Sequence, residues 1–143
     1  MESTTTSLGT LPDGTELQIA GDTVTGIGLA TITVDDYAAA LHFYCDIMGL
    51  QGIHPMNEQS CYIALNQTQG IYVIGGRERI ATPARATRTT VALEVISATA
   101  MFARLRSKGI AIPFDEPMQM NDTTWWFYCT DPAGNQIECI GGR

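Results

Sequence analysis

Glu138 is the residue whose type and position most directly suggest chemistry. It lies in an alternating run, QIECI, in which it shares one strand face with Gln136 and Ile140. Burying a lone carboxylate is costly, so on a covered face Glu138 needs a partner, a metal ion or water. On an open face it is a solvated acid. The residue is therefore a candidate base or ligand-binding group, or a surface charge.

Aromatic residues precede this acid. Trp125–Cys129 (WWFYC) is a second strand-like run, and DPAGN joins it to the run that holds Glu138. Pro132 sets φ for a tight turn, and the glycine and asparagine after it tolerate positive φ, so the pattern predicts a hairpin. Trp125 and Trp126 should then point to opposite faces. One indole is expected to face a ligand, unless these aromatics only pack in the core.

The cysteines and histidines give weaker signals. No two cysteines have the CxxC spacing of a zinc knuckle, so they are interpreted as buried free thiols in a reducing cytosol, although a Cys129–Cys139 bond across the hairpin is conceivable. His42 falls inside a predicted helix, and His54 lies directly before a proline. These positions are more typical of surface or packing histidines than of metal ligands. The cysteines are Cys45, Cys61, Cys129 and Cys139.

Size and composition indicate one globular domain. The chain has 143 residues, 45% hydrophobic and 16% charged, with a net charge of −7. Acidic charge disfavours nucleic acid or an acidic membrane surface as partner. No apolar run approaches the roughly 20 residues that cross a bilayer, and the first residues lack the features of a secretory signal. We therefore expect a cytoplasmic protein.

Two similar successions of elements follow one another along the chain. Strands, helices and glycines recur at an offset of about 60 residues, with Gly49 and Gly109 each ending a helix. A unit of one strand, one helix and three strands leaves one sheet face uncovered, so two units can form a cleft. The strands are predicted at 15–19, 26–34, 51–54, 61–65, 71–74, 89–95, 110–113, 125–129 and 136–140, and the helices at 37–48 and 98–108.

Three other segments are predicted to be irregular. Met1–Gly9 is polar and expected to fray, and Asp115–Asp122 is expected to be a loop. Gly75–Arg88 is a linker with half of the eight basic residues, which are either solvated or in contact with a partner subunit or an acidic ligand. Those residues are Arg77, Arg79, Arg85 and Arg88.

The residues at this point resemble a known family. The stretches ITVDDY at 32–37, FY at 43–44, IMGL at 47–50, VALEV at 91–95 and DPAGNQIE at 131–138 look like the vicinal oxygen chelate superfamily of glyoxalase I, bleomycin-resistance proteins and extradiol dioxygenases. The resemblance covers Gly26 to Ile140. It implies an α+β fold of paired βαβββ modules around a half-barrel cleft, very often in a homodimer. It further implies an extension at 1–24 and one domain at 25–143, with modules at about 25–76 and 88–141.

The resemblance also implies four metal-ligand positions. Matched residue by residue, the first, third and fourth fall on Leu29, Thr90 and Glu138, and the second falls within Ile71–Ile74, with Val73 as the matched residue. Leucine and valine have no donor atom, and a neutral threonine is a poor ligand, so only Glu138 keeps a ligand type. We therefore expect no metal and no other cofactor. A facial triad for dioxygenation, or a metal that polarises a carbonyl, is not provided by this set.

Two functions from different classes remain. The first is a metal-free protein that binds a small aromatic or cationic molecule in its cleft through stacking and cation–π contacts. The alternative is a lyase, isomerase or dioxygenase-like enzyme that uses Glu138 as its base or as a metal ligand, with Glu94 as a coupled neighbour. A domain without surviving chemistry is a third possibility. The expected ligand-binding residues are Leu29, Thr31, Tyr62, Tyr72, Thr90, Trp125, Trp126, Tyr128 and Glu138.

Overall fold

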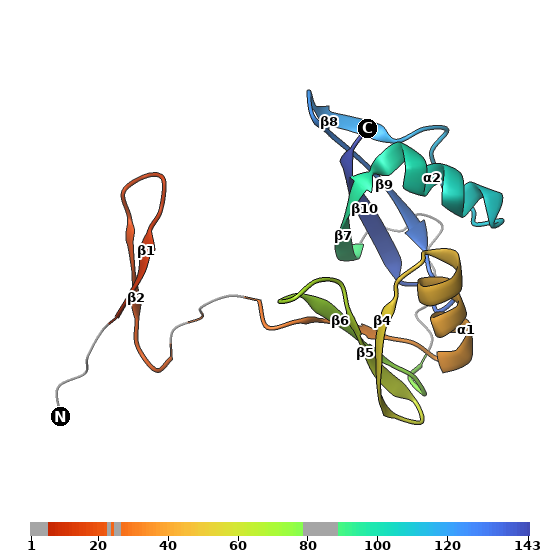
Figure 1. The fold of residues 1–143 in the computed structure, drawn as a ribbon, viewed down its shortest axis with the longest axis horizontal. Helices are drawn as coiled ribbons and strands as arrows, with labels where there is room; N and C mark the ends of the chain where they lie inside the picture. Colours follow the sequence, from red (N-terminus) through yellow and green to blue (C-terminus); the bar gives the residue numbers. More distant parts are fainter. Residues whose placement is uncertain (1–5, 23, 25–26, 79–88) are drawn as a thin grey trace.

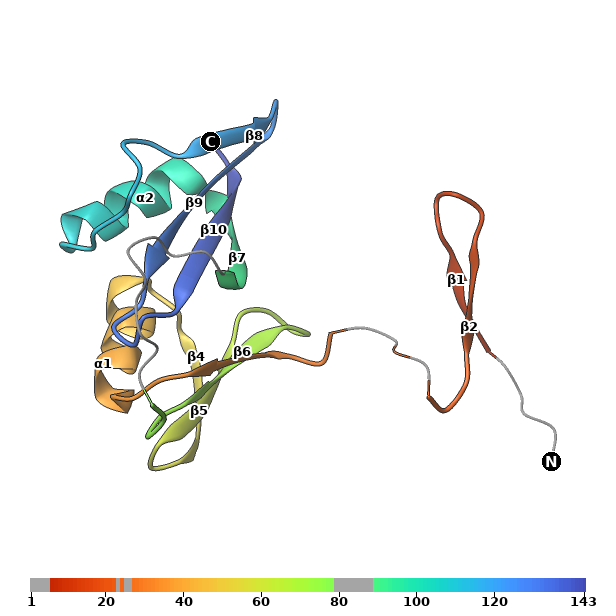
Figure 2. The same cartoon turned by 180° about the vertical axis from the view of Figure 1, so that it is seen from behind.

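A computed structural model describes residues 6–22, 24, 27–78 and 89–143 of the chain. These residues form a two-stranded hairpin and two four-stranded sheets (Figures 1 and 2). The elements are β1 (Thr6–Thr10), β2 (Glu16–Ile19), β3 (Ala30–Thr33), α1 (Tyr37–Leu41), the π-helix η1 (His42–Ile47), β4 (Gly52–Asn57), β5 (Ser60–Ala64), β6 (Gly70–Ile74), β7 (Thr89–Ser97), α2 (Ala98–Ser107), β8 (Met118–Asn121), β9 (Thr124–Thr130) and β10 (Gln136–Gly142).

The two four-stranded sheets confirm the predicted repeat. The first module has the strand order β3-β6-β5-β4, and the second has β7-β10-β9-β8. In each, the first strand runs parallel to the last, while the other neighbours are antiparallel. Gly49 and Gly109 follow the helical segments with φ of 87° and 80°, so both take the left-handed conformation that glycine adopts most easily. The fold is therefore α+β with paired βαβββ modules.

The core joins the helices to one face of each sheet. Ile32 and Val73 of the first module and Phe127 and Ile137 of the second are fully buried in one cluster. The ring of Phe102 on α2 meets Phe127 edge-on, with centroids 5.3 Å apart, so this helix covers the inner face of the second sheet. The opposite face of each sheet carries the more exposed side chains. These two opposite faces are the surfaces on which a ligand site can be built.

The first helix differs from the regular α-helix predicted over Tyr37–Met48. Asp36 caps its start by accepting a hydrogen bond from the Ala39 backbone N–H, but only the first five residues are α-helical and the next six form a π-helix. The Met48 N–H reaches the Phe43 carbonyl, the longer hydrogen bond of a π turn, at 2.9 Å. The wider turn lets Phe43 and Tyr44, adjacent in sequence, both lie in the core.

Two predictions about the second module are wrong. Residues 110–113 do not form a strand, because the guanidinium of Arg106 on α2 binds the carbonyls of Ile112 and Phe114 and holds this segment as a loop. The expected loop at 115–122 contains β8 instead. A side chain–backbone turn, in which Asn121 Oδ1 accepts from the Thr123 N–H at 3.0 Å, folds β8 back onto β9.

The N-terminal part of the chain also departs from expectation. Residues 6–9, predicted to fray, lie in β1, which pairs with β2, while residues 1–5 lie outside the described residues. The predicted strand at 15–19 is observed as β2, but in this hairpin and not at the edge of a larger sheet. Of the predicted linker, residues 79–88 lie outside the described part, including Arg79, Arg85 and Arg88. Within the described ranges, no helix has the length and apolar character needed to cross a membrane.

Candidate functional site

A buried polar network fixes the β9–β10 hairpin against the first module. The Tyr44 hydroxyl of η1 donates to Asp131 Oδ2 at 2.6 Å, and Asn135 Nδ2 donates both to that oxygen and to the Thr33 carbonyl of β3. Burial, and then the charge of Asp131, raise the pKa of Tyr44. The tyrosine therefore stays protonated and remains a donor. The turn between the two strands is held at the junction of the modules.

This hairpin places one indole, one phenol and the candidate acid on the open face of the second sheet. Glu138 pairs with Tyr128, and Ile140 pairs with Trp126, so these four side chains share a face. Trp125 pairs with Gly141 on the other face and packs against the core cluster. The prediction that the two tryptophans face opposite ways is thus borne out by the register. Trp126, and not Trp125, lies beside Glu138.

Two polar side chains, Thr89 and Gln136, lie beside Glu138. Thr89 Oγ1 donates to Glu138 Oε2 at 3.5 Å and accepts from Gln136 Nε2 at 2.9 Å. Thr90, the predicted site residue, is the extra residue of a β-bulge, where Gln136 pairs with Thr89 and the next pair is Ile137 with Val91. The bulge makes Thr89, which the sequence did not single out, the neighbour of the acid. Gln136 shares the predicted face, so its alternation with Glu138 was the available signal.

The amide of Gln136 has one further property. Its Oε1 atom is buried and has no hydrogen-bond partner in the described part of the chain. Most buried polar atoms are paired, so this unpaired oxygen beneath the face adds its negative partial charge to that of the nearby carboxylate. Such an arrangement favours a donor or a cation over an anion.

Phe114 completes an aromatic group on the same face, and the sequence did not indicate it. Its ring centroid lies 5.6 Å from that of Trp126 and 4.9 Å from that of Tyr128, both in edge-to-face geometry. Arg106 holds Phe114 in place through its carbonyl. Because Phe114 lies in an irregular segment, periodicity gives no signal for it.

The first module carries a second group of predicted residues. Thr31, Tyr72 and Tyr62 are neighbours across β3, β6 and β5, so they lie in one row on the open face. A Cβ atom at Gly70 would collide with the Tyr62 ring, so the glycine lets this ring lie flat along the sheet. His54 pairs with Tyr62 and extends the row, with ring centroids 6.3 Å apart.

A cleft of about 580 Å³ lies between the modules. Its walls include Leu29 and Gly70 from the first module and Glu94 and Ile140 from the second. Of the nine predicted ligand-binding residues, Leu29 lines this cleft. The first-module row (Thr31, Tyr62 and Tyr72) and the Glu138 group (Trp126, Tyr128 and Glu138) lie on the flanking sheet faces. The chain thus gathers six of the nine predicted residues into two groups, and leaves Leu29 in the cleft, Thr90 at the bulge and Trp125 packed against the core.

The four implied ligand positions do not fit a metal ion. Val73 is fully buried on the helix-covered face, one position out of phase with the open face, where Tyr72 lies instead. Leu29 has no donor atom, and Thr90 lies at the bulge. In the described ranges, no three side chains among His, Cys, Asp and Glu come together. Glu94, the expected companion of Glu138, is offset from it by two residues, since it pairs with Ile140 while Ala92 pairs with Glu138.

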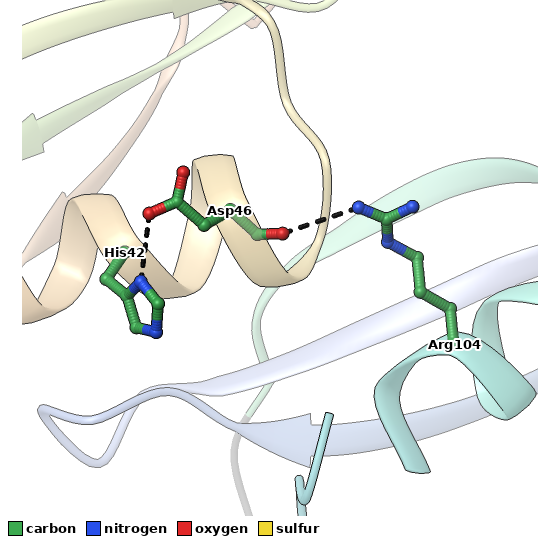
Figure 3. A network of polar contacts seen from close by, with 3 residues as sticks. All are labelled: His42, Asp46 and Arg104. Carbon is green, nitrogen blue, oxygen red and sulfur yellow. Dashed lines mark hydrogen bonds and ion pairs between the residues drawn. The ribbon is translucent and has the colours of Figure 1, made fainter. Parts of the chain in front are cut away.

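The other candidate groups are His42 and the four cysteines. His42 Nδ1 is 2.9 Å from Asp46 Oδ2 on the exposed side of η1, and Arg104 of α2 donates to the backbone carbonyl of Asp46 at 3.4 Å (Figure 3). The described structure has free thiols at all four cysteines. Burial raises the pKa of Cys45, so this partly exposed thiol is a poor nucleophile at neutral pH. His42 thus lies in a surface contact, and three of the four cysteines are buried.

Comparison with known proteins agrees with this architecture. The model of the Glyoxalase/Bleomycin resistance protein/Dioxygenase superfamily matches residues 26–139. No curated protein matches the sequence. Among solved structures, a Bacillus anthracis protein assigned to the glyoxalase family is similar with a TM-score of 0.64 and 20% identity, over 85% of this chain and 98% of the other.

Two further solved structures, a lyase and an antibiotic resistance protein, show the same fold. Lactoylglutathione lyase from Agrobacterium tumefaciens has a TM-score of 0.62 and 18% identity, over 83% of this chain and 95% of the other. A mutant of the fosfomycin resistance protein FosX from Listeria monocytogenes, in complex with Mn(II) and a dihydroxypropylphosphonic acid, has a TM-score of 0.62 and 14% identity, over 85% and 93%. At these identities the likeness concerns the fold. With the family match over most of its length, the chain belongs to the Glyoxalase/Bleomycin resistance protein/Dioxygenase superfamily.

Proposed function

We propose that this protein binds a small aromatic or cationic molecule on the open face of its second module. The observation that carries the proposal is the adjacency of the aromatic group Phe114, Trp126 and Tyr128 to Glu138. Aromatic faces attract planar rings and cations, and a carboxylate supplies the opposite charge. The acceptor-rich surroundings, with Gln136 Oε1 unpaired, favour the same ligands. This binding requires no metal ion.

A homodimer is part of this proposal. The Glu138 group and the row formed by Thr31, Tyr62 and Tyr72 lie on the open faces of two different sheets. A second copy can place its first-module row opposite the Glu138 group, which would complete an enclosed site. Two-fold symmetry would then give two equal sites. Light scattering at micromolar concentration should give about twice the 15.5 kDa of one chain.

The test uses two probes that differ in charge. Benzyltrimethylammonium is an aromatic cation, and benzyl alcohol is a neutral aromatic of similar ring size. We expect the cation to quench tryptophan fluorescence at a lower concentration. Glu138→Gln keeps the shape of the side chain and should weaken the cation by about 1–3 kcal/mol if the pair is desolvated, with little effect on the alcohol.

The two tryptophans provide the matched controls. Trp126→Leu removes a ring of the open face and should weaken both probes while leaving the fold intact. Trp125→Leu removes core packing and should lower the free energy of unfolding by about 2–4 kcal/mol with a smaller effect on affinity. Unchanged binding of both probes in Glu138→Gln and Trp126→Leu would contradict the proposal. Loss of turnover on an identified substrate, with affinity kept, would favour Glu138 as the base of an enzyme.

A further inference from the structure

The N-terminal hairpin, β1–β2, is an element without a core of its own. It precedes the superfamily match, which begins at residue 26, and it is a sheet of only two strands. All described side chains from Gly9 to Gln18 are exposed, including the apolar Leu11 and Leu17. A lone two-stranded hairpin is at best marginally stable in water, so this one needs a surface to pack on.

The segment that connects the hairpin to β3 leads to the same conclusion. Val24 is 87% exposed and Ile27 is 94% exposed, although both are large apolar residues. Ile27 also lines the rim of the cleft between the modules. Several exposed apolar side chains in one short stretch are typical of a surface that is covered in the assembled protein.

The outer strand β8 has the features of an acceptor for this hairpin. Each four-stranded sheet has two edge strands, β3 and β4 in the first and β7 and β8 in the second, and β4 and β8 are the edges away from the parallel pair. β4 contains Pro55, which has no N–H and is a common protection of a sheet edge. β8 (MQMN) has neither a proline nor a charge, and all four of its residues are exposed. Its methionines are flexible and adapt to an apolar partner.

We propose that the hairpin of one chain adds β2 to β8 of a second copy of this chain. β2 is the suitable strand, because a register shift between Ser7 and Gly9 makes β1 irregular. β2 and β8 each have four residues, and Leu17 would lie against the methionines of β8. Opposite views both show the hairpin far from β8 of its own chain (Figures 1 and 2). Reciprocal exchange in a two-fold dimer covers the β8 edge of both copies and gives each hairpin a sheet to pair with.

The experiment traps the contact between two different chains. Cys45→Ala removes the one native thiol that is not buried, and Leu17→Cys is then placed in one chain and Met120→Cys or Met118→Cys in another. After mixing, unfolding, refolding and mild oxidation, we expect a linked pair with about twice the 15.5 kDa mass of one chain. Residues directly opposite in paired strands have Cβ atoms about 4.5–5.5 Å apart, which suits a disulfide bond.

The control is a methionine at the other edge. Met56 on β4 is 61% exposed, close to the 55% of Met120, so Met56→Cys tests random collision. Linkage several-fold above this control, together with a loss of dimer stability on deletion of residues 2–22, supports the exchange. Equal linkage with Met56→Cys contradicts it. So does a chain carrying both Leu17→Cys and Met120→Cys that forms only an internal link. Probe binding is measured separately, so failure here does not decide the proposed function.

Discussion

Asp131 offers the sharpest test of how the two modules are held together. Its carboxylate is almost fully buried and accepts hydrogen bonds from the Tyr44 hydroxyl at 2.6 Å, the Ala133 N–H at 2.9 Å, and the N–H and side-chain amide of Asn135 at 2.8 and 3.0 Å. Hydrogen bonds to a charged group contribute about 1.5–3 kcal/mol each, and a buried donor left without an acceptor costs about 1–3 kcal/mol.

These values predict the result of a double-mutant cycle. Tyr44→Phe removes one donor and leaves three, so it should lower the free energy of unfolding by about 2 kcal/mol. Asp131→Ala removes the acceptor of all four donors, the Tyr44 hydroxyl included, while relief of the buried charge offsets part of the loss, so it should cost about 4 kcal/mol. The double variant has no unpaired hydroxyl and should also lose about 4 kcal/mol, which gives a coupling energy of about 2 kcal/mol.

Urea unfolding followed by tryptophan fluorescence measures all three variants. Every variant is compared at one protein concentration, because association changes the apparent stability. Asp46→Ala is the control. Its carboxylate binds His42 on an exposed surface, so the variant should change stability by less than about 0.5 kcal/mol. A coupling energy below about 0.5 kcal/mol between Tyr44 and Asp131 would refute the reasoning.

Two further predictions concern the second sheet. Burial raises the pKa of Cys129 and Cys139 to about 12, from an ordinary value of 9.0, so the folded thiols keep their protons while unfolded ones ionise. The contribution of these thiols to stability is therefore fully present below pH 9, and it should fall toward pH 12 by up to about 1.4 kcal/mol per pH unit for each thiol. Urea unfolding across this pH range should show a shallower fall in stability for the double variant Cys129→Ala/Cys139→Ala than for the parent. A Cβ atom at Gly141 would collide with the Val95 carbonyl, so Gly141→Ala should lose about 1–3 kcal/mol. Gly28→Ala, where a Cβ meets nothing within 4 Å, should stay within about 0.5 kcal/mol, and thermal unfolding compares the two.

The sequence predicted the elements that have a strong local pattern. The β9–β10 hairpin and the opposite orientation of the two tryptophans follow from turn residues and alternation. The π-helix could not be predicted in this way, since the spacing of the apolar residues over 37–48 is that of an α-helix. Its extra width is set by packing against the sheet.

The errors at the candidate site have two physical causes. Val73 was assigned to the open face by position in a family pattern, but strand pairing with Ile32 and Cys61 places it in the core, one residue out of phase. Thr89, and not Thr90, lies beside Glu138, because a β-bulge shifts the register at that point. A bulge is a property of two paired strands, so the single strand at 89–97 carries no sign of it.

The position of Glu138 depends on the network that joins the modules. Glu138 lies three residues after Asn135, whose amide holds the Thr33 carbonyl of β3 and Asp131 of the turn. The start of β10 also carries Gln136, which reaches Glu138 through Thr89. A shift of the turn would therefore move the acceptor-rich end of the open face relative to the first module. If the proposed function is correct, Tyr44→Phe should weaken benzyltrimethylammonium more than benzyl alcohol at temperatures where the variant is fully folded. Unchanged affinity for both probes would show that the network acts on stability alone.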